Sequence, residues 1–298
     1  MQNVIEVYLT GGLGNQLFQI SYAIKLQEMY DAKIIINEEW YKNNKIRSFE
    51  AGELIFKDEN IEVKIPKYIK NIHKWLFISS KIIYKLNGLF FKEEKIPIPL
   101  LKLYSFLGLY LGYNQDLVKF KRSFLGYYSL HGYFQWPKSL PSQNNLKKKI
   151  PFLNRYNSNL KRINFNNFDF CVCLRIAKDY INAKDICIDY LAYLESSFKI
   201  AKEKYPNATF HIFTDDYSEL KNIKLPAKNY INYERDIFNK INQMSSFTNF
   251  IIMNSSFAWW PIYFSNLKSN SIVIMPKIWY KQYKKNLHPM HEFATHLI

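Results

Sequence analysis

The chain has 298 residues, of which 48% are hydrophobic and 17% aromatic, so it can build a folded core and is not intrinsically disordered. Its 41 Lys and Arg against 25 Asp and Glu give a formal net charge of +16. That excess indicates either an anionic partner (nucleic acid, a phosphorylated small molecule or an acidic membrane surface) or a solubilising lysine coat. The length fits one large domain or two of about 150 residues.

Three cysteines, Cys171, Cys173 and Cys187, form no Cys-x-x-Cys pair. An odd count in this arrangement excludes a disulfide framework and a cysteine zinc site, and it favours a reducing compartment. The first residues lack the pattern of a signal peptide. Two apolar stretches, beginning at Trp75 and Ile96, carry lysine and are interrupted by Gly or Pro, so neither predicts a transmembrane helix. We therefore expect a cytoplasmic protein.

The first half of the chain opens with a βαβ pattern. A strand is predicted over residues 4–9, followed by the turn TGGLGNQ, an amphipathic helix and a second strand over residues 32–37. Residues 56–125 are basic and aromatic without a clear period, and we expect helices and loops there. Residues 129–135, SLHGYFQ, predict a strand and a turn. The polar PKSLPSQNNLKKK that follows predicts an interdomain linker or a helix start.

Strand and helix patterns alternate again in the second half. Strands are predicted in FDFCVCLRI, ATFHIFTDD, NFIIM and SIVIMP, and helices in DICIDYLAYLESSFKIAKEKY and after NSSF. Two α/β domains, residues 1–150 and 151–298, sharing a cleft, are the predicted architecture. Ligands of such sheets bind beyond the carboxyl ends of the strands. TGGLGNQ, RIAKD, TDD and NSSF each follow a predicted strand, so we expect these four loops to converge at one edge.

The turn GGLGNQ carries no standard nucleotide motif, because it lacks both the third glycine of the dinucleotide fingerprint and the Gly-Lys-Ser/Thr of a P-loop. Gly12 and Gly14 allow two interpretations. They serve a tight turn with positive φ, or they let backbone N–H groups approach an anionic ligand at a helix start. Asn15 and Gln16, which we expect to be exposed at that helix start, favour the ligand.

Arg175 lies near the end of a strongly apolar strand, where an unpaired guanidinium is costly. Its partner is either Asp179, in a structural ion pair, or a phosphate held in the bidentate geometry of arginine. In the second case Asp179 orients the arginine or contacts the ligand. Cys173, two residues earlier, is expected to be a packed thiol.

The segment NSSFAWW combines a polar turn with large aromatic residues. Ser255 and Ser256 are good N-cap residues, so the segment predicts helix capping. The same geometry directs free N–H groups outward as an anion site, and the two interpretations are compatible. We expect Trp259 and Trp260 to clamp the helix to the sheet and Phe257 to line a base or sugar pocket.

Four motifs together resemble the bacterial and animal α-1,2-fucosyltransferase family. They are GGLGNQLFQ (11–19), GYFQ (132–135), FTDD (213–216) and NSSFAWW (254–260), in the family's order. The family's donor motif, His-x-Arg-Arg-x-Asp, is absent. CLRIAKD is more similar to the His-Leu-Arg-Ile-Gly-x-Asp of protein O-fucosyltransferases, with Arg175 and Asp179 in place. In that alignment Cys173 replaces the histidine and Ile176 the second arginine.

This resemblance implies a glycosyltransferase fold of the B type, with two Rossmann-like domains facing a cleft. Residues 1–150 would handle mainly the acceptor and residues 151–298 would bind GDP-fucose. The reaction would transfer L-fucose in α-1,2 linkage to a galactoside hydroxyl of a surface glycan such as an O antigen. It would proceed with inversion and without cofactor or metal ion, which agrees with the lack of any Asp-x-Asp motif.

The resemblance also implies a set of site residues. Arg175 would bind the β-phosphate of the leaving GDP, Asp179 is a weak candidate for a catalytic role, and the general base is unassigned. The expected donor-binding residues are Gly12, Gly14, Asn15, Gln16, Arg175, Asp215, Asn254, Ser255, Ser256 and Phe257. The expected acceptor-binding residues are His131, Tyr133 and Gln135.

Alternatives stay open at this point. The same fold could use another GDP-6-deoxyhexose, such as GDP-colitose. A net charge of +16 also suggests nucleic-acid binding, but the lysines look dispersed, with no basic helix. The basic, aromatic stretch 62–125 suggests peripheral contact with the inner face of the plasma membrane, where lipid-linked glycan acceptors sit. We expect a GDP-sugar donor, a glycan acceptor and this membrane contact as partners, and no nucleic acid.

Overall fold

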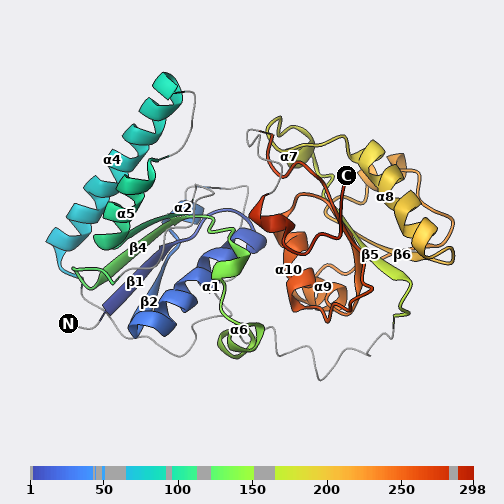
Figure 1. Ribbon diagram of the computed structural model, residues 1–298, viewed down its shortest axis with the longest axis horizontal. Coiled ribbons are helices and arrows are strands. Elements are labelled where there is room, and N and C mark those ends of the chain that lie inside the picture. Colours follow the sequence, from blue (N-terminus) through green and yellow to red (C-terminus); the bar gives the residue numbers. More distant parts are fainter. Residues whose placement is uncertain are drawn as a thin grey trace. The chain divides into compact units, whose positions relative to one another are not determined.

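The computed structural model describes residues 3–42, 44, 49–50, 65–91, 96–112, 122–150, 165–281 and 288–298. The chain divides into two compact units, Met1–Pro151 and Phe152–Ile298. Each unit contains a parallel β-sheet and its own helices (Figure 1), which confirms the predicted α/β class. The predicted domain boundary borders residues 151–164, which lie outside the described residues, and the cleft between the domains stays a prediction.

The sheet of the first unit has four strands in the order β2-β1-β4-β3, and every neighbouring pair is parallel. Its strands are β1 (Asn3–Tyr8), β2 (Ala32–Asn37), β3 (Leu109–Gly112) and β4 (Tyr127–Gly132). Its helices are α1 (Leu13–Tyr30), α2 (Glu39–Lys42), α4 (Lys67–Phe91), α5 (Ile98–Phe106) and α6 (Gln143–Lys149), with a 3-10 turn η1 (Pro137–Ser139).

Local sequence explains where these elements begin and end. Helix α1 ends at Asp31, which adopts the left-handed conformation and donates its N–H to the carbonyl of Gln27. Helix α6 begins after Ser142, whose hydroxyl accepts the N–H of Asn145, so the stretch predicted as a linker or a helix start forms a helix. Strand β3 was not predicted, because four consecutive buried residues show no alternation that marks a strand.

A close approach of two glycines shapes the end of this sheet. Gly112 and Gly132 pair in the register of β3 and β4, and Gly132 has a φ of +118°. A Cβ on Gly132 would lie 2.6 Å from the backbone of Gly112. Only glycine permits both the backbone angle and the contact. The chain turns directly afterwards, and the buried Phe134 stacks on Tyr22 of α1 with ring centroids 4.3 Å apart.

The sheet of the second unit has six parallel strands in the order β10-β9-β8-β5-β6-β7. They are β5 (Asp169–Leu174), β6 (Thr209–Thr214), β7 (Asn229–Ile231), β8 (Asn249–Ile252), β9 (Val273–Met275) and β10 (His296–Leu297). The helices are α7 (Lys178–Ile181), α8 (Tyr190–Lys204), α9 (Ile237–Met244) and α10 (Ser256–Phe264), with 3-10 turns η4 (Glu219–Asn222) and η5 (Pro289–His291). Successive strands run outward from β5 to one side and from β8 to the other. This is the Rossmann strand order, with its switch point between β5 and β8.

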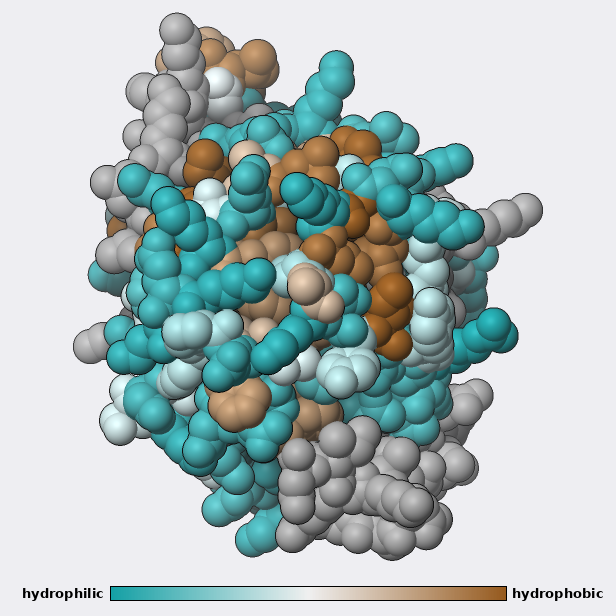
Figure 2. All heavy atoms as spheres, turned by 90° about the vertical axis from the view of Figure 1, so that its right-hand side faces the viewer, coloured by the Kyte–Doolittle hydropathy of each residue, from teal (hydrophilic) through white to brown (hydrophobic). Residues whose placement is uncertain are grey.

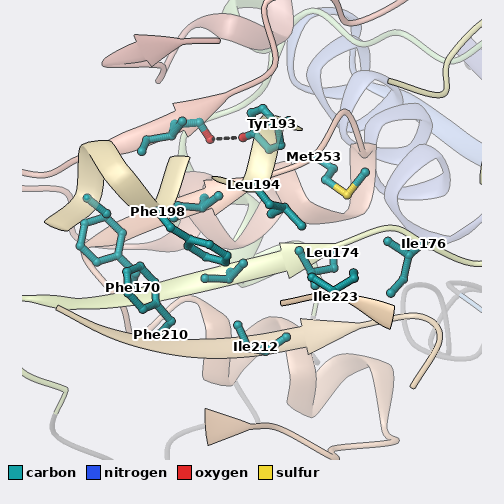
Figure 3. Close-up of a cluster of buried hydrophobic side chains, with 14 of the residues drawn as sticks. Phe170, Leu174, Ile176, Tyr193, Leu194, Phe198, Phe210, Ile212, Ile223 and Met253 are labelled. Carbon is teal, nitrogen blue, oxygen red and sulfur yellow. Dashed lines mark hydrogen bonds between the residues drawn. The ribbon is translucent and has the colours of Figure 1, made fainter. Parts of the chain in front are cut away.

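The core of this unit packs α8 onto one face of the sheet. Phe170, Leu174 and Ile212 of the strands meet Leu194 and Phe198 of α8 in one buried cluster (Figure 3). The Tyr193 hydroxyl lies 2.6 Å from the carbonyl oxygen of Ile252 and 3.0 Å from that of Ile274. Helix α8 is therefore fixed to β8 and β9 as well as to the strand it follows.

Cys173 is buried in β5, and burial raises the pKa of its thiol to about 12. The expectation of a packed thiol is confirmed. Four helices and strands of this unit were not predicted: β7, β10, α7 and α9. Helix α9 did carry a signal, because Asp236 accepts the N–H groups of Phe238 and Asn239, and Ile237, Ile241 and Met244 follow with helical spacing.

The surface agrees with the lysine-rich composition. Hydrophilic side chains cover most of the face seen in Figure 2, around a smaller apolar area. One expectation is wrong: a basic helix does exist, since α4 contains five lysines and no Asp or Glu. Within the described part of the chain, no helix is both long enough and apolar enough to span a membrane.

We expect Gly132→Ala to lower the free energy of unfolding by about 3 kcal/mol, because it adds a steric clash to an unfavourable φ. Gly126→Ala is the matched control. Gly126 also has a positive φ, +63°, but its added Cβ would meet only the side-chain oxygen of Asn3 at 3.2 Å. That variant should cost about 1 kcal/mol. Urea unfolding of both variants measures the difference, and equal losses would contradict the proposed clash.

Candidate active site

Three of the four predicted polar loops meet at the carboxyl edge of the second sheet. Strands β8, β5 and β6 are neighbours, so Asn254, Arg175 and Asp215, which follow them, lie along one edge. The fourth loop, TGGLGNQ, follows β1 in the other sheet, where β1 pairs with β2 and β4. The expectation that all four loops share one sheet edge is therefore wrong.

Arg175 lies at the switch point between β5 and β8. Its Nη2 is 3.9 Å from Oδ2 of Asp179, and its guanidinium carbon lies 5.2 Å from the centre of the Tyr180 ring. The Arg175 side chain is 26% exposed. At that separation the contact with Asp179 is an ion pair without a hydrogen bond, and such partly exposed pairs contribute little to stability. Asp179 is a partner of Arg175, and the guanidinium is accessible to a ligand.

Asp215 holds the loop that carries Arg175. Its Oδ1 accepts the backbone N–H groups of Ile176 at 2.8 Å and Ala177 at 3.1 Å. The carboxylate after β6 thus fixes the backbone that follows β5. Hydrogen bonds to a charged acceptor are among the stronger ones in proteins. Asp215 is in position to orient Arg175, and its direct contact with a donor stays a prediction.

Asn254 joins the loops after β5 and β8. Its Oδ1 accepts the Tyr180 hydroxyl at 2.6 Å, and its Nδ2 donates to the carbonyls of Ile186 and Trp279 at 2.6 and 2.9 Å. The side chain is buried, and both amide hydrogens and the oxygen are engaged. The side chain of Asn254 therefore acts as a structural cross-link. Only its backbone could contact a sugar-nucleotide donor.

The first turn of α10 presents free donors. Ser255 is at the N-cap, but its hydroxyl makes no capping bond, so the expected side-chain cap is absent. Among the described residues, no acceptor bonds the backbone N–H of Ser256, Phe257 or Ala258. Trp259 and Trp260 are fully buried, which confirms that they anchor the helix. An anchored helix N-terminus with open N–H groups favours an anion.

Lys240 is a further cation at this edge, and the sequence did not single it out. Its Nζ lies 3.4 Å from the carbonyl oxygen of Thr214, the last residue of β6. In the described ranges, no carboxylate lies within ion-pair distance of this half-buried ammonium. Besides burial, Asp215 raises the pKa of Cys173, while Lys240 and Arg175 lower it, so both cations act on the same point of the sheet edge.

The start of α1 differs from the expectation. The Glu50 carboxylate accepts the N–H of Leu13 at 3.2 Å, and Gln16 accepts the N–H of Glu50 at 3.1 Å. Gln16 also donates to the carbonyl of Gly11. It is fully buried, so the expectation of an exposed Gln16 is wrong. A carboxylate already lies at this helix start, and a second anion there would meet its charge.

The GYFQ motif lies beside this turn, because β4 is adjacent to β1. Gln135 donates to the side-chain oxygen of Asn15 at 3.0 Å. Gln19, which sequence reasoning missed, donates to the Gly132 carbonyl at 2.8 Å and to the Thr10 hydroxyl at 3.1 Å. The two motifs of the first unit are therefore joined through glutamine side chains.

His131, one of the three predicted acceptor residues, is buried. Its ring stacks between Tyr8 and Phe77, with centroids 4.1 and 3.9 Å away. Burial lowers the pKa of His131 to about 3, so the ring is neutral near pH 7. Tyr133 is half-buried and Gln135 is buried. Contact of these residues with an acceptor stays a prediction.

Over the part of the chain that the structure describes, no three His, Cys, Asp or Glu side chains are grouped so as to hold a metal ion. The expected catalytic and binding roles stay predictions for the following residues: Arg175, Asp179, Gly12, Gly14, Asn15, Ser255, Ser256 and Phe257. What the structure adds is their placement: the two cations and the start of α10 lie in the second unit, and the glycine turn in the first.

Comparison with known proteins places this geometry in context. The model of the family described as Glycosyl transferase family 11 matches residues 4–291. The O-antigen biosynthesis glycosyltransferase WbnK of Escherichia coli is 24% identical over 309 residues, which cover 91% of this chain and 93% of that protein. The fucosyltransferase NodZ from Bradyrhizobium has a TM-score of 0.48 and 11% identity, over 88% of this chain and 92% of its own. NodZ alpha-1,6-fucosyltransferase soaked with GDP-fucose gives 0.49 and 12%, over 89% and 93%.

We expect Asn254→Ala to lower the free energy of unfolding by about 3 kcal/mol, because it removes three hydrogen bonds of a buried side chain. Tyr180→Phe removes one of those bonds and the acceptor of the Ile188 N–H, and it should cost about 1 kcal/mol. Denaturant unfolding of the single and double variants measures the coupling between the two side chains. Strictly additive losses would show that they do not act as one cross-link.

Proposed function

Because the chain belongs to glycosyl transferase family 11, we propose that it transfers L-fucose from GDP-fucose to a galactoside hydroxyl of a surface glycan, forming an α-1,2 linkage. Membership confirms, at the level of the family, the resemblance carried by the four motifs. The role of the Escherichia coli relative in O-antigen biosynthesis supports a surface glycan as the acceptor.

The observation that carries this proposal is the arrangement at the switch point of the second sheet. Arg175 follows β5, and the free N–H groups of α10 follow β8 after a short turn. A crevice at this point in a Rossmann-ordered sheet is where phosphates of nucleotides bind. Arginine offers paired donors to phosphate oxygens, and a helix start offers backbone donors. We therefore assign the GDP moiety to this edge.

The proposed reaction breaks the bond between C1 of fucose and the β-phosphate oxygen and forms a bond from C1 to the acceptor oxygen, with inversion. The acceptor hydroxyl loses its proton to a general base that stays unassigned; Asp179, which pairs with Arg175, is a weak candidate. Charge builds on the leaving diphosphate, where Arg175, Lys240 and the N–H groups of Ser256 and Phe257 are placed to stabilise it. Preorganised donors of this kind lower barriers by several kcal/mol without a metal ion.

The first unit supplies the acceptor side in this proposal. The turn containing Gly12, Gly14 and Asn15 closes over the junction of sugar and phosphate, and Tyr133 and Gln135 meet the acceptor. Glu50 argues against a diphosphate directly at the start of α1, because its carboxylate occupies the Leu13 N–H. Gln16 contributes by holding the turn, since it is buried and bonded to Gly11 and Glu50.

Two alternatives remain: the same enzyme class with another donor sugar, and a nucleic-acid-binding protein. GDP-colitose would use the same phosphate contacts, so only the sugar pocket separates it from GDP-fucose. Nucleic-acid binding was suggested by the charge, but the family match extends from residue 4 to residue 291 and leaves little of the chain for another module.

We also propose that the enzyme contacts the inner face of the plasma membrane peripherally, near a glycan acceptor carried on lipid.

Incubation of the purified protein with GDP-fucose and a panel of β-galactosides tests the main proposal. We expect an α-1,2-fucosylated product and release of GDP, detected by mass spectrometry and linkage analysis. EDTA should leave the rate unchanged, because protein groups carry the charge of the leaving diphosphate. Preferential use of GDP-colitose would reassign the donor, and loss of activity with EDTA, restored by a divalent cation, would contradict the metal-independent mechanism.

Arg175→Lys should lower kcat/KM by about 100-fold or more while the protein stays folded, because lysine lacks the paired donors of arginine. Lys240→Met should weaken GDP binding by about tenfold, since it removes one charge near the diphosphate. Isothermal titration with GDP measures binding independently of turnover. Lys204→Met, on the exposed end of α8, is the control for loss of one positive charge. Near wild-type turnover in Arg175→Lys would remove the central role of this residue.

A further inference from the structure

Helix α4 exposes two separate stripes on its solvent side. Large apolar residues recur at alternating intervals of four and three residues, with Ser79 in the one remaining position of the series: Tyr68, Ile72, Trp75, Ile82, Leu86 and Leu89. We call this set the apolar stripe. Successive residues of a helix are rotated by about 100°, so the lysines of α4 form a second row next to the apolar stripe. The lysine stripe consists of Lys67, Lys70, Lys74, Lys81 and Lys85.

The apolar stripe is exposed in the folded unit. Trp75 is 71% exposed, Leu89 is 77% exposed and Tyr68 is 60% exposed. A single exposed apolar residue needs no explanation, but six of them along one side of a helix do. Phe90, at 75%, extends the exposed apolar surface near the end of the helix.

A third side of α4 already packs on its own domain, so the stripes are not an unfinished core. Ile69 and His73 are buried, and the His73 ring nitrogen lies 2.7 Å from the Ser129 hydroxyl of β4. Phe77 stacks on His131. Figure 1 shows α4 extending beyond the strands that it covers, with α5 alongside. One side of the helix thus packs on its own domain, and the stripes face solvent.

Helix α5 flanks the apolar stripe and has a similar character. The Ser79 hydroxyl lies 3.0 Å from that of Tyr104. Helix α5 exposes Ile98, Leu103 and Phe106 and contains one lysine and no acid. The two helices thus combine exposed apolar side chains with six lysines and no Asp or Glu.

Charge decides what kind of partner fits. A second copy of the chain, docked through the same stripes, would place two lysine stripes close together, and like charges at an interface are unfavourable. Nucleic acid would satisfy the lysines but not a series of aliphatic and aromatic side chains beside them. An anionic bilayer satisfies both, because headgroups pair with lysine while apolar side chains enter the acyl boundary.

We propose that the apolar and lysine stripes of α4 form a docking surface for an anionic lipid bilayer, with α4 lying in the plane of the interface. The proposal rests on the peripheral membrane contact proposed above and names the surface that makes it. It does not depend on the identity of the sugar donor. Docking would hold the first unit, and the acceptor site assigned to it, next to glycans presented on lipid.

Vesicle binding by the full-length protein, without sugar nucleotide, tests this. Flotation with phosphatidylcholine vesicles containing 30 mol% phosphatidylglycerol should recover the protein, and pure phosphatidylcholine should not. Neutralising two lysines, in Lys70→Gln/Lys74→Gln, should weaken partition by roughly 25-fold, because each lysine at such a surface contributes about fivefold. Lys199→Gln/Lys202→Gln, on the exposed face of α8, removes the same charge elsewhere and should change binding little.

A second measurement reports insertion. Phosphatidylglycerol brominated on its acyl chains should quench tryptophan fluorescence in the wild type and distinctly less in Trp75→Phe, which keeps an aromatic ring at the position. Circular dichroism and thermal unfolding confirm that the variants are folded. Because no GDP-fucose is present, failure of the transfer reaction would leave this result intact, and the converse also holds.

Several outcomes would overturn the proposal. They are no binding to anionic vesicles, equal weakening by the α4 and α8 variants, and quenching unchanged by Trp75→Phe. A wild-type dimer in light scattering that Trp75→Ser converts to monomer would assign the surface to a second copy. Tighter binding to a DNA or RNA duplex than to anionic vesicles, lost in Lys70→Gln/Lys74→Gln, would assign it to nucleic acid.

Discussion

A hydrogen bond of 2.6 Å from the Tyr180 hydroxyl to the side-chain oxygen of Asn254 joins the loops that follow β5 and β8. These loops diverge at the switch point of the sheet, and a ligand can enter between them only because they diverge. The cross-link holds Arg175 and the start of α10 in fixed relation. The N–H of Arg175 also meets the sulfur of Met253 at 3.2 Å, which ties the two strands immediately before the site. Donors fixed in advance need no reorganisation when charge develops on a leaving group.

The acidic and basic side chains near this edge differ in the partners that they have. Asp215 is used by two backbone N–H groups and Asp236 by the first turn of α9, while Asp179 is paired with Arg175. Each of these carboxylates thus has a partner within the scaffold. Lys240, by contrast, meets only a carbonyl oxygen among the described residues. Arg175 and Lys240 are thus two positive groups at the carboxyl ends of β5 and β6 that could meet an anionic ligand such as a diphosphate.

Several polar residues of the four motifs hydrogen-bond backbone groups of neighbouring segments. Gln16 and Gln19 bond the turn after β1 and the end of β4, Asp215 bonds the loop after β5, and Asn254 bonds two carbonyls and a tyrosine. Motif letters therefore identify the scaffold of a site as much as the groups that touch a ligand. At the edge of the second sheet, the groups available to an anion include the backbone N–H donors of α10 and the two cations Arg175 and Lys240. Of these, only Arg175 belongs to a sequence motif as a residue type.

Sequence by itself determined the α/β class, most of the strands, the packed state of Cys173 and the anchoring role of Trp259 and Trp260, because these follow from local apolar pattern and residue volume. It also determined the family, through short motifs in a fixed order. Tertiary structure decided the rest. Strand order separated the turn after β1 from the other three loops. A hydrogen bond from the Leu13 N–H placed the Glu50 carboxylate at the start of α1. Packing of one side of α4 left its apolar stripe and its lysine stripe exposed. These features depend on contacts between residues far apart in the chain, and no local pattern encodes such contacts.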